Sequence, residues 1–217
     1  MRQIRSMNFV NMISASPLEN RLNLLSMVNV KYLVARSDLD WEGLRPVDFT
    51  SKEYPELKVY ENTRRLPRAF WVPHCIVATT HRDFGRIMVN REFDPARLVV
   101  LERSPKDRPC QKPPGDDQGT GKVRLLNRGY DHLELESDAA APGFLFLSES
   151  YYPGWRATVD GAPATIHRAN YKFRALVLPA GRHRIQMEYR PVSFRLGAMV
   201  SGFTILICAG FLIKRWH

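Results

Sequence analysis

The sequence predicts an α+β protein that is mainly β. We expect an antiparallel, two-layer β-sandwich-like domain, preceded by a small α/β unit and followed by one transmembrane helix. Short segments rich in β-branched and aromatic residues recur along most of the chain, bounded by Pro, Gly, Asp or Asn. Residues 104–121 interrupt these segments with Pro, Gly and charge, and residues 196–213 form an uncharged apolar stretch.

Residues 1–103 are predicted to form the small mixed α/β unit. The first residues carry two arginines and a mixed apolar stretch that is too weak for a signal-peptide core. Residues 17–28 are predicted to be helical, because Ser16 can act as a cap and Pro17 suits a first turn. A weaker helix is predicted at 81–89. The expected strands cover residues 31–35, 57–62, 68–73, 75–79 and 97–102.

Residues 104–121 are predicted to be a linker or exposed loop, because they offer little apolar surface to bury. The sandwich-like domain is expected over residues 122–195, where Asp160-Gly161 and Pro179-Ala180-Gly181 mark tight turns. Alternating polarity in residues 132–136 and 184–189 indicates strands with one buried face. The expected strands cover residues 122–129, 132–138, 143–150, 155–161, 164–169, 173–181 and 183–191.

Residues 196–213 are predicted to be a transmembrane helix. At 1.5 Å per residue the segment is about 27 Å long, close to the thickness of a bilayer core. Arg195 precedes it and a basic tail, residues 214–217, follows it, as expected for interface anchors. The charges on the two sides do not decide which side of the membrane the larger domain occupies.

The composition excludes several classes of function. The chain has 32 Lys and Arg against 22 Asp and Glu, for a net charge of +10. The basic residues are spread along the chain and form no concentrated stripe, so we expect no nucleic-acid partner. A diffuse positive charge is better suited to a location near an anionic membrane lipid than to binding nucleic acid. The cysteines form no CxxC motif, and we predict no metal site and no cofactor. Whether Cys75 and Cys110 form a disulfide is left open.

The part of the chain from Phe144 to Gly197 carries a more specific pattern than a generic sandwich. It resembles the carboxy-terminal region of the YfhO family of bacterial polytopic membrane proteins, which look like GT-C type glycosyltransferases that use lipid-linked sugars. A weaker similarity runs through residues 29–34 and 66–70. The residues that carry the resemblance are Ser148, Tyr151-Tyr152-Pro153-Gly154-Trp155, Asp160-Gly161, Arg168-Ala169-Asn170, Phe173-Arg174, Pro179-Ala180-Gly181, His183, Tyr189, Pro191 and Ser193-Phe194-Arg195.

The resemblance implies a location and a set of partners. It implies a cell-membrane protein of the cell envelope, single-pass in this chain, with an extracytoplasmic domain and a cytoplasmic carboxyl terminus. Its partners would be membrane lipid, the remaining transmembrane helices of a parent protein, and a lipid-linked sugar or envelope glycan. Family members begin with many membrane helices, so we expect this chain to be a fragment. The catalytic carboxylate of GT-C enzymes lies in an early loop, so no catalytic residue is predicted here. The alternative is an independent tail-anchored adaptor with a cytosolic β domain.

Glu149, Tyr151, Tyr152 and Trp155 are the candidate carbohydrate-binding residues. Sugar faces stack on aromatic rings, and a carboxylate accepts hydrogen bonds from sugar hydroxyls. The favoured alternative is structural, with Trp155 filling the sandwich core. Asp160 is the nearest second carboxylate for glycosyl chemistry, but a turn position explains it without a catalytic role.

Three basic residues are candidates for binding a lipid phosphate or the pyrophosphate of a lipid carrier: Arg168, Lys172 and Arg174. A solvated strand face is the favoured alternative for these three side chains. The histidines are scattered, and we find no catalytic triad, HExxH motif or phosphate loop in the sequence.

Overall fold

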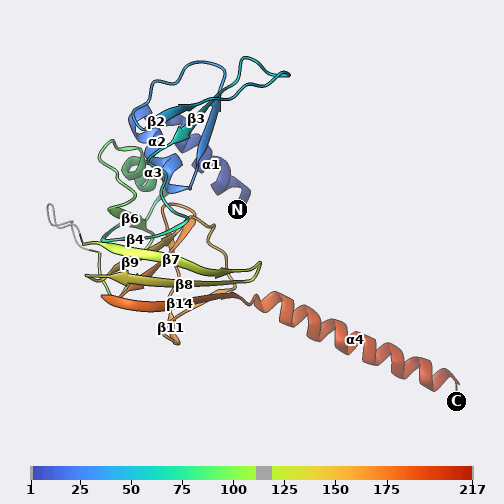
Figure 1. The fold of residues 1–217 in the computed structure, drawn as a ribbon. Coiled ribbons are helices and arrows are strands. Elements are labelled where there is room, and N and C mark those ends of the chain that lie inside the picture. Colours follow the sequence, from blue (N-terminus) through green and yellow to red (C-terminus); the bar gives the residue numbers. More distant parts are fainter. Residues whose placement is uncertain (1, 111–118, 217) are drawn as a thin grey trace.

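The structure is a computed structural model that describes residues 2–110 and 119–216 (Figure 1). It is mainly β, as the sequence predicts, and its described strands form three sheets. The helices are α1 (Arg2–Ala15), α2 (Leu18–Met27), α3 (His81–Val89) and α4 (Val192–Trp216). The strands are β1 (Tyr32–Ala35), β2 (Leu44–Val47), β3 (Lys58–Asn62), β4 (Ala69–Val72), β5 (His74–Val77), β6 (Leu98–Leu101), β7 (Gly121–Arg128), β8 (His132–Ala139), β9 (Gly143–Leu147), β10 (Trp155–Val159), β11 (Ala162–Ala164), β12 (His167–Ala169), β13 (Phe173–Leu178) and β14 (Gly181–Tyr189).

Two large sheets form the sandwich-like body. One has the strand order β11-β10-β14-β8-β7 and is antiparallel throughout. The other has the order β4-β9-β13-β12-β6-β5, in which β5 and β6 are parallel and the remaining pairs are antiparallel. A smaller sheet, β1-β3-β2, belongs to the first part of the chain.

The six-stranded sheet is a middle layer that is buried on both faces. Every residue of β9 is buried, and its side chains alternate between two cores. Phe144 and Phe146 belong to a core that also contains Leu24 and Phe84 from the helices. Leu145 and Leu147 belong to a core shared with the five-stranded sheet. A strand covered on both faces is expected to be apolar throughout, which explains the sequence Gly-Phe-Leu-Phe-Leu.

Helices α2 and α3 confirm the predicted helices. Thr80 caps α3, because its side chain accepts a hydrogen bond from the Asp83 backbone while the Asp83 carboxylate reaches back to Thr80. The Phe84 and Met88 side chains of α3 are buried in the helical layer. Asn20 of α2 donates a hydrogen bond to the Met88 carbonyl oxygen at 2.6 Å, which ties α2 to α3.

Helix α1 and strand β2 were not predicted from the sequence. The polar residues of α1 obscure its contacts with the core, among them the ring of Phe9, which packs edge-on against Phe173 at 5.2 Å. Strand β2 contains Pro46, which argues against a strand in a sequence pattern. Since β2 is an edge strand of its sheet, the proline leaves no central ladder bond unmade.

The expected division between residues 1–103 and 122–195 does not separate two hydrophobic cores. Strands β4, β5 and β6 come from the first range, and they share one sheet with β9, β12 and β13 from the second. In the predicted linker, 104–121, residues 111–118 lie outside the described residues. The described part is held to the sheet, because Cys110 forms a disulfide with Cys75 of β5.

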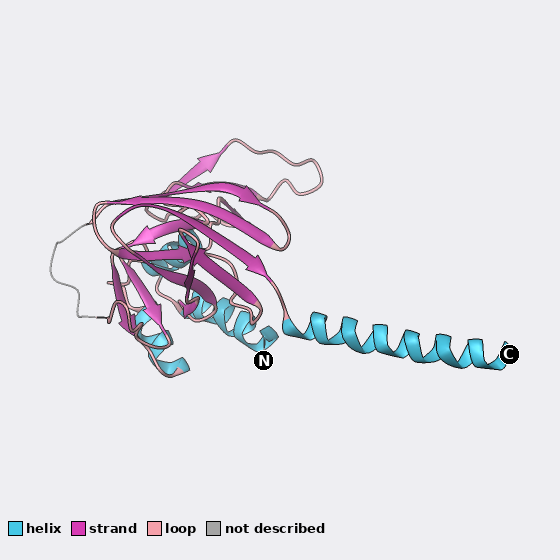
Figure 2. Cartoon of the chain, turned by 90° about the horizontal axis from the view of Figure 1, so that it is seen from below, coloured by secondary structure: helices cyan, strands magenta, loops and turns pink. Residues whose placement is uncertain are grey.

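Helix α4 contains the predicted segment 196–213 and extends it in both directions. It leaves the end of the sandwich and projects away from the body (Figure 2). Its window Val192–Ala209 has a mean hydropathy of 1.7, and none of it is buried within the protein. Phe194, Ile205 and Leu206 are each at least 67% exposed. By length and composition α4 can cross a membrane, which would cover these apolar side chains.

Candidate functional site

A buried ion pair lies at the end of the sandwich from which α4 leaves. Glu149 follows β9, and its Oε2 accepts a hydrogen bond from Arg174 Nη2 of β13 at 2.6 Å. The Arg174 side chain is only 3% exposed and that of Glu149 is 18% exposed. Burial lowers the pKa of the Arg174 guanidinium, and the charge and hydrogen bond of Glu149 oppose this shift. Glu149 is therefore the counter-charge that allows Arg174 to stay ionised in the interior.

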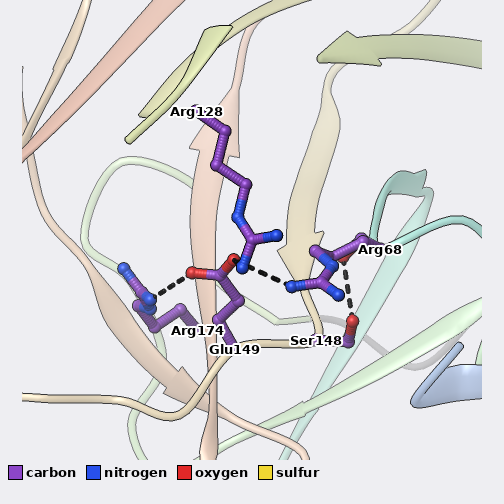
Figure 3. Close-up of polar contacts among 5 residues, drawn as sticks. All are labelled: Arg68, Arg128, Ser148, Glu149 and Arg174. Atoms are coloured by element: carbon purple, nitrogen blue, oxygen red, sulfur yellow. Dashed lines mark hydrogen bonds and ion pairs between the residues drawn. The ribbon is translucent and has the colours of Figure 1, made fainter. Parts of the chain in front are cut away.

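Two further arginines approach the other oxygen of the same carboxylate (Figure 3). Arg68 immediately precedes β4, and its Nη1 lies 3.7 Å from Glu149 Oε1. Arg128 ends β7, and its Nη2 lies 3.6 Å from the same oxygen. These distances are too long for hydrogen bonds, and Oε1 has no hydrogen-bond partner among the described residues. We call Arg68, Arg128, Glu149 and Arg174 the arginine cluster.

Trp155 joins the arginine cluster to the start of α4. Its ring is partly buried against the inner core of the sandwich, and the Arg174 guanidinium carbon lies 4.3 Å from the ring centroid. Gly154, just before it, adopts a φ of +105°, which favours glycine. The Gly154 carbonyl oxygen accepts a hydrogen bond from the Arg190 backbone at 2.7 Å. Trp155 is thereby held beside the residues that lead into α4.

Two pockets open beside Tyr151. One has a volume of about 530 Å³ and is lined by Tyr151, Tyr152 and Trp155 together with Glu188 and Arg190. The other has a volume of about 630 Å³, and its walls include Tyr151, Glu102, Asp107, His167 and Arg168. Both are lined by Tyr151 and Ile166, so they adjoin. We call the two together the Tyr151 cleft.

Arg168 and His167 are two of the polar residues that line the second pocket, which also has Arg103 and Lys106 in its wall. Arg168 donates a hydrogen bond to Glu102 at 2.9 Å, and its guanidinium carbon lies 4.7 Å from the centroid of the Tyr151 ring. Burial lowers the pKa of His167, so its imidazole is held neutral near pH 7. The cleft thus combines aromatic surface with polar groups, both neutral and charged, as ligand-binding clefts commonly do.

The structure brings together some of the predicted carbohydrate-binding residues. Tyr151, Tyr152 and Trp155 line one pocket. Glu149 does not line either pocket, because its carboxylate faces the arginines. Asp160 lies just after the far end of β10, where its carboxylate Oδ2 is 2.6 Å from His183 Nδ1. It therefore does not pair with Glu149.

The three predicted phosphate-binding residues are dispersed. Arg168 lines the second pocket. The Lys172 ammonium lies about 5.5 Å above the rings of Phe9 and Phe173. Arg174 is buried. Sequence reasoning missed Arg68 and Arg128, since they are far from Glu149 along the chain and no local motif marks them. In the part of the chain that the structure describes, no group of three or more His, Cys, Asp or Glu side chains could hold a metal ion.

The fold and the site define a class of protein: a β-sandwich-like domain carried on a helix that can span a membrane, with a polar and aromatic cleft beside that helix. Residues 124–201, from β7 to the first part of α4, match the family model described as "Bacterial membrane protein YfhO". This stretch is a YfhO-family region, and the family description together with helix α4 fits a membrane location.

A relative from Bacillus subtilis (strain 168), named "Uncharacterized protein YfhO", is 27% identical over 96 residues. The matched part is 44% of this chain and 11% of the relative, so the chain matches only a small part of that protein's length. No solved structure matches.

Proposed function

We propose that the folded part is the extracytoplasmic accessory domain of a YfhO-like membrane glycosyltransferase. In this proposal α4 is its last transmembrane helix, and the Tyr151 cleft binds the sugar of a lipid-linked donor or of an envelope glycan. The chain would be a fragment, and the catalytic carboxylate would lie in another part of the longer protein. The observation that carries the proposal is the aromatic pocket beside the start of α4.

The chemistry and the position of this pocket both support sugar binding near a membrane. Tyr151 and Trp155 offer ring surface, while Glu188 and Arg190 offer charged hydrogen-bonding groups to sugar hydroxyls. Arg190 lies two residues before Val192, the first residue of α4. A sugar attached to a membrane lipid stays close to the bilayer surface, and a pocket beside a membrane helix can reach it.

The disulfide between Cys75 and Cys110 supports the extracytoplasmic side. Disulfides persist in oxidising compartments and are rare in the cytosol, where thiols are kept reduced. The alternative, a tail-anchored adaptor with a cytosolic domain, predicts two free thiols at these positions. Alkylation of the protein in intact cells, followed by a gel-shift assay under non-reducing conditions, distinguishes the two. Reactive Cys75 and Cys110 would refute the extracytoplasmic placement.

Sugar binding is tested on the full chain in detergent with a short-chain polyprenyl-phosphate glucose as the probe. Tyr151→Ala is the best variant, because Tyr151 lines both pockets and is not part of either core. We expect a loss of affinity on the order of tenfold. Tyr54→Ala is the matched control, since Tyr54 is an exposed tyrosine outside the cleft. Equal binding by both variants and the wild type would refute the cleft as the sugar site.

The same preparation tests the accessory role. We expect the isolated chain to transfer no sugar from the probe, because the proposal places the catalytic carboxylate elsewhere. Turnover by the purified chain, lost on substitution of one of its own carboxylates, would make it an enzyme by itself and refute this part of the proposal.

A further inference from the structure

We propose that Arg68 and Arg128 form a binding site for a phosphate group, at the end of the domain that faces the membrane. This inference goes beyond sugar binding and uses different residues from the Tyr151 cleft. It rests on the proposed function only in placing α4 across the membrane.

The first argument is the charge of the arginine cluster. Three guanidinium groups surround one carboxylate, so Glu149 balances only one of the three positive charges. Its better contact goes to the buried Arg174. Arg68 and Arg128 are left at 3.7 and 3.6 Å from Oε1, with side chains 43% and 48% exposed. Two like charges held this close in a partly buried place favour the binding of an anion between them.

The second argument is that the fold fixes the backbones of the two arginines before any ligand binds. The Arg68 carbonyl oxygen accepts hydrogen bonds from the Ser148 backbone at 2.8 Å and from the Ser148 hydroxyl at 3.1 Å. Arg128 is the last residue of β7, and it pairs with Leu133 of β8. Figure 3 shows both guanidinium groups reaching the same carboxylate, Arg68 from just before β4 and Arg128 from the end of β7. Planar guanidinium groups bind two phosphate oxygens at once, which a phosphate between two arginines would satisfy.

The third argument is the position of the cluster relative to α4. Arg128 is followed by the β7–β8 turn, and the Asp131 carbonyl oxygen in this turn accepts a hydrogen bond from the Tyr189 backbone at 2.7 Å. Tyr189 lies three residues before the first residue of α4. Tyr130, at the tip of the same turn, is fully exposed. Tyrosines are enriched at the headgroup level of membranes, so a membrane-spanning α4 would bring this turn and Arg128 close to lipid phosphates.

A second arginine group, in the five-stranded sheet that also contains Arg128, provides a matched control. Arg124 and Arg182 flank Glu136 at 2.8 and 2.7 Å, which are direct ion-pair distances. This group contains no buried arginine, and its two arginines are 69% and 68% exposed. Changing both to Gln removes the same charge from the protein as changing Arg68 and Arg128 to Gln.

The experiment uses the full chain in neutral detergent and two probes. Inorganic phosphate binding is measured by calorimetry, and phosphatidylglycerol binding by native mass spectrometry against phosphatidylcholine. We expect Arg68→Gln/Arg128→Gln to weaken binding of the anionic probes by about 100-fold, or about tenfold for each arginine, and Arg124→Gln/Arg182→Gln to change it little. If the double variant does not fold, Arg128→Gln alone is expected to show the tenfold loss.

The two probes distinguish the source of the phosphate. A preference for phosphatidylglycerol over phosphatidylcholine that disappears in the Arg68→Gln/Arg128→Gln variant supports a lipid headgroup. Binding of inorganic phosphate without that lipid preference supports the phosphate site and assigns it to a soluble phosphate group. Equal binding by the two double variants would overturn the site. Tyr151→Ala should leave phosphate binding unchanged, so a failed sugar-binding test does not decide this one.

Discussion

Replacing Glu149 with Gln should destabilise the protein strongly, although it removes only one charge. Arg174 is 3% exposed, and its one direct ion-pair partner among the described residues is Glu149. Removal of one partner from a buried ion pair costs about 3 to 5 kcal/mol, because the remaining charge is left buried without compensation. The Arg174 guanidinium also contacts the Trp155 ring, which offers only a weak substitute for a carboxylate.

The expected magnitude lies toward the lower end of that range. Glu149 is 18% exposed, so water reaches part of the site. Arg68 and Arg128 are about half exposed, and their added repulsion is screened by solvent. We therefore expect a loss of about 3 kcal/mol in the free energy of unfolding, taken from the lower bound for a broken buried pair. For a protein of this size that corresponds to a fall in Tm of roughly 6 to 12 °C.

The assay is thermal unfolding of the full chain in detergent, followed by near-ultraviolet circular dichroism. Glu136→Gln is the matched control, because Glu136 also pairs with two arginines but both are exposed. We expect its effect to be much smaller than that of Glu149→Gln, because ion pairs with exposed arginines contribute little to stability. Glu149→Gln/Arg174→Met should recover part of the lost stability, since it removes the uncompensated charge. A Tm for Glu149→Gln equal to that of Glu136→Gln would refute the reasoning.

Three further predictions concern other parts of the molecule. Cys75→Ser opens a disulfide that spans a sequence separation of 35, so it should cost about 4 kcal/mol in oxidising buffer and almost nothing once the wild type is reduced too. Ile205→Arg places a charge near the middle of α4, which costs about 2.5 to 3.5 kcal/mol on insertion scales and should reduce carbonate-resistant membrane association. His183 contacts two acceptors, Asp160 and the Ala180 carbonyl oxygen, and its pKa is raised above 6.5, chiefly by the hydrogen bond with Asp160. Its contribution to stability is therefore complete below pH 6.5 and lost as the pH rises through the raised pKa, and His183→Gln should flatten this part of the pH profile.

Local signals in the sequence were sufficient for most of the elements. The Asp160-Gly161 turn is an example, because both residues have positive φ, as a two-residue hairpin turn requires, and β10 and β11 pair directly across it. Helix α3 is another, since its cap and buried face lie within one segment. These features depend on neighbours in the chain, and a pattern of residue types can reveal them.

The candidate site could be predicted only in part, because it is made by pairing between distant strands. The run from Tyr151 to Trp155 is visible in the sequence, and its side chains do line one pocket. The burial of Arg174 is not visible, since it depends on the sheet that β13 joins and on the ring of Trp155. Arg68 reaches Glu149 because β4 pairs with β9, which no motif in either segment indicates.

The same strand pairing limits what the region 124–201 can do alone. This region contains β9 and β13, whose outer faces carry Phe144, Phe146 and Phe173 into the core beneath the helices. The remaining walls of that core come from earlier residues, including Val72 and Val99 of β4 and β6. Without those strands the region would expose one face of its sheet and a free edge on β9, and both favour aggregation. The segment from α1 to β6 is therefore an integral part of the fold that carries the site, and it also supplies Arg68 to the arginine cluster.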